Sequence, residues 1–290
     1  MTLPPSAPSP PQPLSSLPAD AWRAMLGVFT DIDDTLTTEG AITPEALDAL
    51  ARLRGAGLHC IAITGRPVGW SVPFAQTWPL DAIVAENGAV ALFRDDAAAA
   101  RATPGAPGRL YQADAATRGA NHARLQAVAA RVLREVPGAT LARDSAGRET
   151  DIAIDHSEFS HLDAARIAQV ATIMRSEGLQ ATVSSIHVNG WIGPHDKWQG
   201  ACWIARALLG RDLPGEVGRW VYVGDSTNDQ VMFRHFPHSV GVANIRRFAH
   251  ELTDPPRYVT EGERGAGFAE VVERLLADRA AGETSLTRVA

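Results

Sequence analysis

Cysteines and long apolar runs are both scarce in this chain. Its two cysteines, Cys60 and Cys202, stand far apart among 290 residues, which excludes a disulfide framework and a cysteine-based metal site. No segment approaches the roughly 20 uninterrupted apolar residues that cross a bilayer, so no membrane association is expected. Because so few cysteines suit a reducing compartment, we expect a cytoplasmic protein.

An excess of positive charge is also absent. The formal net charge is −6, and no basic cluster is present that would follow a phosphate backbone. Nucleic acid is therefore not expected as a partner, whereas a small molecule is. With 290 residues, 45% of them hydrophobic, the chain can bury a full hydrophobic core, and we expect one large domain and a smaller one.

The two ends of the chain differ from its middle. Residues 1–18 are dominated by proline and serine, and they lack the early positive charges and the apolar stretch of a signal peptide. We therefore expect a disordered tail over residues 1–20. A flexible C-terminal tail is expected over residues 280–290.

Strands and helices alternate in the hydrophobic pattern of residues 21–88. Apolar stretches at residues 25–32, 58–64 and 80–87 predict buried strands, and the leucines of residues 43–57 recur at helical spacing. The pattern resumes after residue 192, with helices at 197–209 and 268–278, a short helix after 227, and strands at 219–225 and 238–244. Such alternation predicts a parallel α/β sheet.

Residues 89–191 have another character. After a loop at 94–110 rich in Ala, Gly and Pro, helices are predicted at 122–136 and 162–177, and strands of alternating polarity at 150–156 and 179–188. We interpret this segment as an inserted α+β cap domain. The core then comprises residues 21–88 and 192–279. Acidic residues of the cap, such as Asp151 and Asp155, are interpreted as surface.

Polar residues follow three of the predicted core strands. These segments are DIDDT at 31–35, TGR at 64–66 and GDSTND at 224–229. In an open parallel sheet, ligands bind beyond the carboxyl ends of the strands. Asp31, Asp33 and Asp225 are hard oxygen donors of the kind that Mg²⁺ prefers, so the sequence predicts a magnesium site.

The same segments contain groups that suit a phosphoryl substrate. Lys197, at the start of a predicted helix, offers a compact positive charge, while Thr64 and the Gly65 backbone offer neutral donors. Asp31 could attack phosphorus and form an aspartyl-phosphate. Asp33 could protonate the leaving alcohol and then deprotonate water.

In order and spacing, DIDDT, TGR, DKWQG at 196–200 and GDSTND resemble the four motifs of the haloacid dehalogenase-like phosphatases. The resemblance covers most of residues 26–276, and the insertion resembles the cap of the type IIB branch, which includes Cof-type, sucrose-phosphate and mannosylglycerate-forming phosphatases. It implies a Rossmann-like parallel-sheet core with an α+β cap. It also implies one Mg²⁺ bound by the Asp31 side chain, the Asp33 main-chain carbonyl and Asp225.

Further roles are implied by the resemblance. Its phosphate-contacting positions match Thr64, Gly65, Lys197 and Asn228, and a supporting carboxylate matches Asp229. This chain departs from the family pattern at two positions, where Asp34 and Trp198 stand in place of glycine. The Asp34 side chain either adds an acid to the site or points away and caps the following turn.

Three residues have two interpretations each. Arg66 is either a supporting residue of the site or a surface or helix-capping residue. His187 and Asn189 lie among aromatic residues, which suits contact with a sugar substrate, but they also fit a half-buried strand of ordinary packing.

Together these observations predict a Mg²⁺-dependent phosphomonoester hydrolase that acts on a small phosphorylated metabolite, in particular a sugar phosphate. Two alternatives stay open: a phosphomutase with the same aspartyl nucleophile, and a non-catalytic binding protein that retains the scaffold. The four intact motifs favour an enzyme. No oligomeric state is predicted.

Overall fold

The computed structural model describes residues 10–94 and 108–286 and divides into two compact units. One unit comprises residues 1–59 with 216–290, and the other comprises residues 60–215. The predicted fold class is confirmed, because parallel strands with helices form the core and a separate antiparallel sheet belongs to the inserted cap. Among the helices of the described residues, none combines the length and the apolar character needed to cross a membrane.

The first unit is built on a parallel sheet in the order β1-β15-β14-β13-β2. Its strands are β1 (Gln12–Pro13), β2 (Gly27–Thr30), β13 (Trp220–Gly224), β14 (His238–Gly241) and β15 (Tyr258–Val259), and a small hairpin adds β3 (Thr37–Thr38) and β4 (Ala41–Ile42). Its helices are α1 (Ala19–Arg23), α2 (Pro44–Gly55), α9 (Gln230–His235) and α10 (Arg264–Leu286), with short 3-10 turns η1 (Leu14–Ser16), η4 (Val217–Arg219), η5 (Thr227–Asp229) and η6 (Ala243–Phe248). β2 and β13 are buried along their whole length, as expected of parallel strands covered on both faces.

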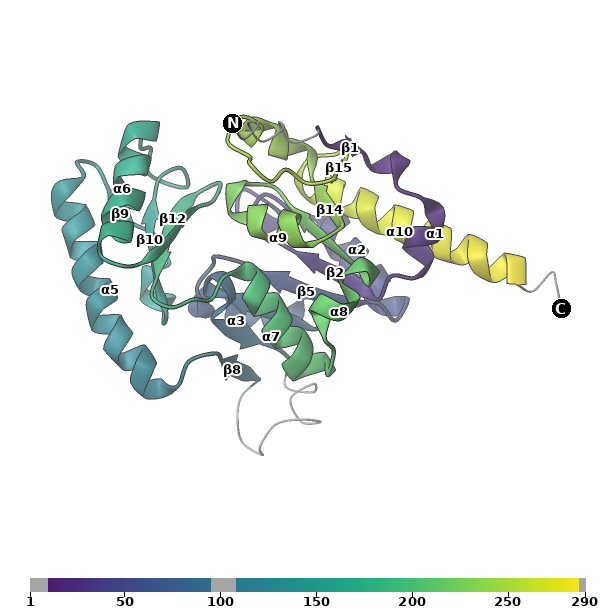
Figure 1. Cartoon of the computed structure of the whole chain (residues 1–290), viewed down its shortest axis with the longest axis horizontal. Helices are drawn as coiled ribbons and strands as arrows, with labels where there is room; N and C mark the ends of the chain where they lie inside the picture. The colour runs from purple at the N-terminus through teal and green to yellow at the C-terminus, as the bar shows by residue number, and fades with distance from the viewer. Residues whose placement is uncertain (1–9, 95–107, 287–290) are drawn as a thin grey trace, which may run out of the picture. The chain divides into compact units, whose positions relative to one another are not determined.

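Helix α2 forms where the leucine spacing predicts a helix. Thr43 caps it by accepting the Ala46 main-chain N–H at 3.2 Å, and Pro44 occupies the first helical position. One face, which includes Leu50 and Leu53, is fully buried, and α2 packs against α10. Figure 1 shows α10 running alongside α1 in this unit.

In the second unit, the core strands β5 and β6 are parallel, and β7 and β8 continue the sheet in antiparallel orientation. The elements are β5 (His59–Ile63), α3 (Val68–Thr77), β6 (Ala82–Ala85), η2 (Glu86–Gly88), β7 (Val90–Leu92), β8 (Arg109–Tyr111), α7 (Lys197–Leu209) and α8 (Leu213–Glu216). The loop predicted at 94–110 falls mostly on residues 95–107, which lie outside the described residues, and β8 occupies part of its end.

The cap has its own sheet, β11-β12-β10-β9, which is antiparallel throughout. Its elements are α5 (Ala115–Glu135), β9 (Thr140–Leu141), η3 (Ser145–Gly147), β10 (Asp151–Asp155), α6 (Ala164–Ser176), β11 (Gln180–Val183) and β12 (His187–Trp191). Helices α5 and α6 lie beside this sheet and bury a core that includes Val132, Ile154 and Met174 (Figure 1). The bounds that the sequence predicts for core and cap stay a prediction.

The strand predicted at 179–188 is wrong as a single strand, because it is a hairpin. β11 and β12 pair in antiparallel register, with Val183 opposite Val188. Ser184 turns the chain between them: its hydroxyl accepts the main-chain N–H groups of Ile186 and His187. Because the alternation of apolar residues continues through this turn, the sequence pattern predicted one strand instead of two.

The disordered tail predicted for residues 1–20 is corrected for the part that the structure describes. β1 pairs in parallel with β15, and Leu14 and Leu17 are 3% and 1% exposed. Proline is tolerated there because β1 is an edge strand. At the other end, α10 continues to Leu286, past the start of the flexible tail predicted from residue 280. Residues 1–9 and 287–290 lie outside the described residues.

The burial of Leu17 has a measurable consequence. Replacing it with alanine is expected to lower the free energy of unfolding by about 2 to 4 kcal/mol, because a buried side chain is lost and a cavity remains. Urea unfolding of the wild type and of Leu17→Ala measures this difference. Leu47→Ala is the matched control, since Leu47 is 39% exposed on α2. Equally small effects at both positions would contradict the ordered N-terminal segment.

Candidate active site

Two neighbouring parallel strands position the first acidic residues. β2 and β13 pair in parallel, and the Asp31 main-chain N–H donates to the Val223 carbonyl at 2.9 Å. Asp31 and Asp225 therefore follow the carboxyl ends of adjacent strands, at the edge where parallel sheets bind ligands. Position 224, just before Asp225, requires glycine, because a Cβ there would lie 2.4 Å from the Asp229 Oδ2 atom.

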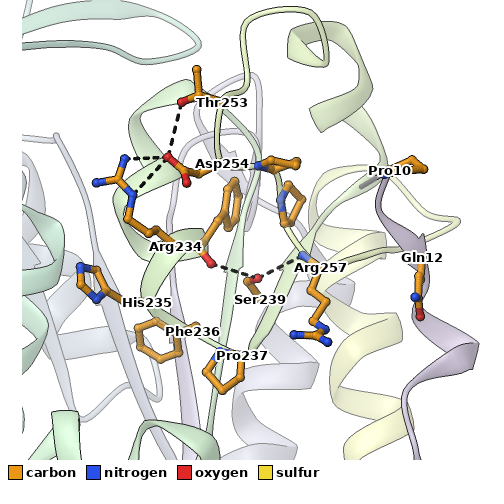
Figure 2. A pocket seen from close by; sticks show the side chains of 13 residues that line it. Pro10, Gln12, Arg234, His235, Phe236, Pro237, Ser239, Thr253, Asp254 and Arg257 are labelled. Carbon is orange, nitrogen blue, oxygen red and sulfur yellow. Dashed lines mark hydrogen bonds and ion pairs between the residues drawn. The ribbon is translucent and has the colours of Figure 1, made fainter. Parts of the chain in front are cut away.

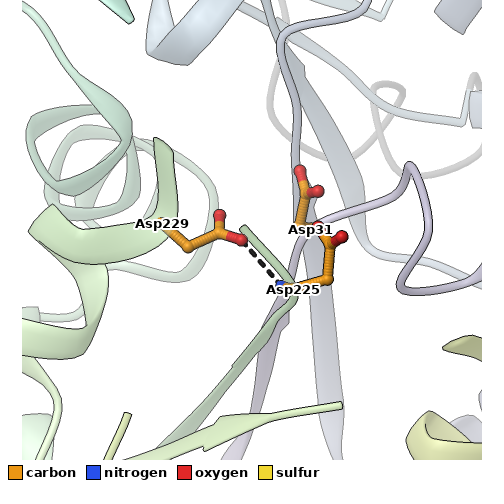
Figure 3. Close-up of side chains that lie close together, drawn as sticks. All are labelled: Asp31, Asp225 and Asp229. Atoms are coloured by element: carbon orange, nitrogen blue, oxygen red, sulfur yellow. Dashed lines mark hydrogen bonds between the residues drawn. The ribbon is translucent and has the colours of Figure 1, made fainter. Parts of the chain in front are cut away.

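Asp31, Asp225 and Asp229 form a buried acidic cluster (Figure 3). One carboxylate oxygen of each lies within 4.8 Å of the other two, and the residues are 4%, 0% and 0% exposed. Carboxylates buried this close together repel one another unless hydrogen-bond donors or a cation compensate their charges. The cluster therefore requires compensation from its surroundings.

Protein donors surround Asp229. Its Oδ1 accepts the Tyr222 hydroxyl, and its Oδ2 accepts the main-chain N–H groups of Asp225 at 2.9 Å and Ser226 at 3.2 Å. Burial, together with the charges of Asp229 and Asp31, raises the pKa of Tyr222 well above its usual value, so this hydroxyl stays protonated. With both oxygens engaged, Asp229 is suited to the supporting role that the sequence predicts.

Two further predicted residues lie in the same unit. Asn228 is 7% exposed, and its Oδ1 accepts the Ser226 hydroxyl at 2.9 Å. Asp33 is half-buried on the turn that follows Asp31. Its carboxylate is not one of the three grouped in the acidic cluster, and the ligand predicted from it is its main-chain carbonyl.

The chemistry of the acidic cluster fits a hard divalent cation. Asp31 and Asp225 contribute carboxylate oxygens, which Mg²⁺ prefers, and each directly follows the last residue of a regular strand. A divalent cation would also offset the repulsion among the carboxylates, since a bound ion is the largest local charge of such a site. Asp31 and Asp225 would hold it.

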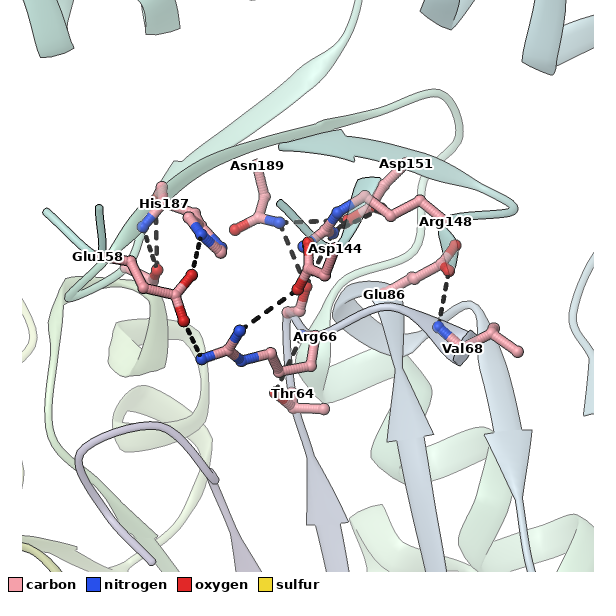
Figure 4. A network of polar contacts seen from close by, with 12 residues as sticks. Thr64, Arg66, Val68, Glu86, Asp144, Arg148, Asp151, Glu158, His187 and Asn189 are labelled. Atoms are coloured by element: carbon pink, nitrogen blue, oxygen red, sulfur yellow. Dashed lines mark hydrogen bonds and ion pairs between the residues drawn. The ribbon is translucent and has the colours of Figure 1, made fainter. Parts of the chain in front are cut away.

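In the second unit, cap residues contact the TGR segment (Figure 4). Thr64 is fully buried, and its Oγ1 accepts the Arg66 main-chain N–H at 3.0 Å. The Gly65 carbonyl accepts from Arg148 Nη1 at 2.9 Å and from Asn189 Nδ2 at 3.3 Å. A Cβ at Gly65 would come within 3.2 Å of the Asn189 Oδ1 atom, so glycine lets the cap approach closely.

Arg66 is buried, with 4% of its surface exposed, so it is not a surface residue. Its guanidinium contacts two cap carboxylates, Asp144 at 3.3 Å and Glu158 at 2.8 Å, and it lies 5.0 Å from the ring centre of Trp70. Arg66 therefore links the end of β5 to the cap.

Glu158 also lies 2.9 Å from His187 Nε2. Burial disfavours the charge of Glu158, but the hydrogen bond with His187 and the positive charge of Arg66 outweigh it and lower its pKa to about 2. His187 and Asn189 are 2% and 1% exposed on β12, and both bond to protein groups. Their predicted contact with substrate stays a prediction.

Lys197 is the first residue of α7 and is 2% exposed. The Asp196 carboxylate caps this helix by accepting the Gln199 main-chain N–H at 2.8 Å. Trp198 is half-buried. Lys197 and Thr64 belong to the second unit and the acidic cluster to the first, so their roles toward phosphate stay predictions.

A pocket of about 650 Å³ in the first unit contains none of the predicted site residues (Figure 2). It is lined by the end of α9 and the start of β14, where Arg234 and Asp254 form an ion pair at 2.6 Å. Because β14 begins there, the pocket lies at the amino ends of the strands, opposite the edge that holds Asp225.

The interpretation of Asp151 and Asp155 as cap surface is wrong, because both are buried. Asp151 contacts Arg148 at 2.8 Å, and the Asp155 carboxylate accepts four successive main-chain N–H groups, those of residues 157–160. Sequence reasoning also missed Asn244, which ends the last predicted core strand and hydrogen-bonds to Asp225. Its position at a strand end, like that of Asp31 and Asp225, is the signal that could have revealed it.

Comparisons with known proteins agree with this architecture. Residues 28–102 match the family model of haloacid dehalogenase-like hydrolases, which confirms the resemblance predicted from the motifs. A search of curated proteins finds no match.

Solved structures share the fold at low sequence identity. A Thermoplasma acidophilum protein has a TM-score of 0.64 at 15% identity, with 87% of this chain and 98% of that chain covered. The sucrose-phosphatase of Synechocystis sp., solved with sucrose and phosphate, has a TM-score of 0.61 at 16% identity, with 87% and 98% covered. A haloacid dehalogenase-like hydrolase of Bacteroides thetaiotaomicron has a TM-score of 0.60 at 16% identity, with 87% and 99% covered.

The low pKa of Glu158 predicts how stability depends on pH. In the unfolded chain glutamate titrates near pH 4.3, so the contacts of the charged side chain stabilise the fold above that pH and are lost as the pH falls toward 2. Glu158→Gln is expected to lower the free energy of unfolding by about 1 to 2 kcal/mol at pH 7. Below about pH 4.3 the difference from wild type should shrink.

Urea unfolding at several pH values measures both effects. Glu135→Gln is the matched control, because Glu135 pairs with Arg131 at the surface and its loss should leave stability unchanged. A difference between wild type and Glu158→Gln that stays constant as the pH is lowered would contradict the ion-pair account.

Proposed function

Because residues 28–102 match the haloacid dehalogenase-like hydrolases, we propose that this chain is a Mg²⁺-dependent phosphomonoesterase that uses Asp31 as its nucleophile. The observation that carries the proposal is the acidic cluster, in which Asp31 and Asp225 are buried together at the ends of two adjacent parallel strands. A bound Mg²⁺ would shield the phosphate charge and bring the phosphoryl group within reach of Asp31.

Hydrolysis then proceeds in two displacements. A carboxylate oxygen of Asp31 attacks phosphorus, the bond to the leaving oxygen breaks, and Asp33 gives a proton to the departing alcohol. Asp33 next takes a proton from water, whose oxygen attacks the phosphorus of the aspartyl-phosphate. The Asp31 carboxylate is regenerated and inorganic phosphate leaves. Asp33 is half-buried, so its carboxyl group can exchange protons with solvent.

Phosphate binding is proposed for the remaining motif residues. Thr64 and Gly65 offer neutral donors, Lys197 offers a positive charge, and Asn228 offers an amide. The order and spacing of the motifs support these roles. Lys197 is 2% exposed at the start of α7, where its side chain has few alternative conformations to lose on binding an anion.

The proposed substrate is a sugar phosphate. Asp144 and Glu158 already balance the charge of Arg66, so this part of the cap has no surplus positive charge for a second anionic group. Their carboxylates are 15% and 17% exposed and can accept hydrogen bonds from sugar hydroxyls. The Synechocystis sp. sucrose-phosphatase, which shares the fold, was solved with sucrose and phosphate.

Asp31→Asn tests the nucleophile. The amide cannot attack phosphorus, so the rate of phosphate release from a panel of sugar phosphates is expected to fall by roughly 10³-fold or more, while circular dichroism stays that of the wild type. Asp48→Asn is the matched control, because Asp48 is an exposed aspartate of α2. Turnover at the wild-type rate in Asp31→Asn would remove Asp31 from this role.

Chelation tests the metal. EDTA is expected to abolish phosphate release and added Mg²⁺ to restore it, since the acidic cluster needs a cation to accept a phosphate dianion. Activity that is indifferent to EDTA would contradict the metal assignment. The same assay separates the mutase alternative, which yields an isomeric sugar phosphate without releasing phosphate.

A further inference from the structure

Asn244 uses its whole side-chain amide to join three segments of the first unit. It is 2% exposed and lies at the start of η6, just after β14. Its Nδ2 donates to Asp225 Oδ2 at 3.1 Å and to the Asp34 main-chain carbonyl at 3.0 Å. Its Oδ1 accepts the Arg264 main-chain N–H at 2.9 Å. An amide is the side-chain group that can donate twice and accept at once.

Asp34 is held a second time, by the first residue of α10. Its Oδ1 lies 2.9 Å from Arg264 Nε, and the two side chains are 21% and 27% exposed. Both residues adopt a positive φ, 54° for Asp34 and 52° for Arg264, which costs energy in a residue other than glycine. The ion pair therefore joins two strained turns, one after Asp31 and one at the start of α10.

These contacts converge on the proposed reaction centre. One Asn244 donor fixes the Asp225 carboxylate, and the other fixes the turn on which Asp33 lies between Asp31 and Asp34. From this geometry we infer that Asn244 is a positioning residue that sets Asp225 and the Asp31 turn for Mg²⁺, and that Asp34 is an anchor for that turn rather than an acid or a ligand. This inference rests on the proposed function.

Substitution of Asn244 has a defined expected effect. In Asn244→Ala the concentration of Mg²⁺ for half-maximal phosphate release should rise by about 10- to 100-fold, as is typical when a group that orients a metal ligand is removed. Stabilisation of the protein by Mg²⁺ in thermal unfolding should weaken in parallel, which is a readout independent of turnover. Asn121→Ala, on helix α5 of the cap, is the matched control.

Asp34→Gly separates the anchor from a chemical role. Glycine adopts the positive φ without strain and keeps the main-chain carbonyl that Asn244 binds, although it loses the ion pair. Because the turn loses this ion pair but keeps the Asn244 hydrogen bond, the variant is expected to need more Mg²⁺ than the wild type but less than Asn244→Ala, and to keep the wild-type pH profile. Loss of activity to the level of Asp31→Asn would assign Asp34 to the chemistry and overturn its role as an anchor.

Further outcomes decide the role of Asn244. A folded Asn244→Ala variant with the wild-type Mg²⁺ requirement would overturn the inference. If that variant fails to fold, the wild-type protein gives the test by NMR, because added Mg²⁺ should shift the side-chain amide signals of Asn244. An absence of any shift at saturating Mg²⁺ would also overturn it. Failure of the wild type itself to release phosphate or respond to Mg²⁺ would instead contradict the proposed function.

Discussion

Burial of negative charge at the ends of β2 and β13 is the constraint on which the first unit depends. Two like charges about 4 Å apart repel by about 4 kcal/mol at an effective dielectric constant of about 20, and the acidic cluster holds three carboxylates. Hydrogen-bond donors around the cluster offset part of this repulsion. Tyr222 and two main-chain N–H groups donate to Asp229, and Asn244 donates to Asp225. A divalent cation bound at the acidic cluster would supply further positive charge and lower this repulsion.

The second unit solves a different problem, which is to hold the cap against the TGR segment. Arg66, Arg148 and Asn189 connect the loop after β5 to the cap through its carboxylates and through the Gly65 carbonyl. The loop that presents Glu158 is itself fixed, because Asp155 accepts four successive main-chain N–H groups. A charged residue in such a network is expensive to bury alone, so each partner depends on the others.

Much of this arrangement could be predicted from the sequence. Asp31 and Asp225 were predictable because apolar strands that end in acidic residues place them at one edge of a parallel sheet. The helix after Thr43 and the inserted cap followed from capping residues and from hydrophobic periodicity.

Several of the missed features depend on long-range contacts. Leu14 and Leu17 lie in a stretch whose composition is that of a disordered tail, and only the edge of β15 gives them a place to pack. Asp151 looked like a surface residue because Asn87 and Asn189, which contact its carboxylate, are brought close only by folding. The role of Asp34 could not be predicted for the same reason. Arg264 is 230 residues away in the chain, but its Nε lies 2.9 Å from Asp34 Oδ1 in the fold.

The stereochemistry of phosphoryl transfer tests the central claim, that Asp31 carries the phosphoryl group between substrate and water. A substrate of the chain is prepared with a phosphate made chiral by oxygen isotopes, and its transferred phosphoryl group is analysed after hydrolysis. Each in-line displacement inverts phosphorus, so two displacements through Asp31 predict net retention of configuration. Net inversion would mean that water attacks the substrate directly, and it would contradict the account.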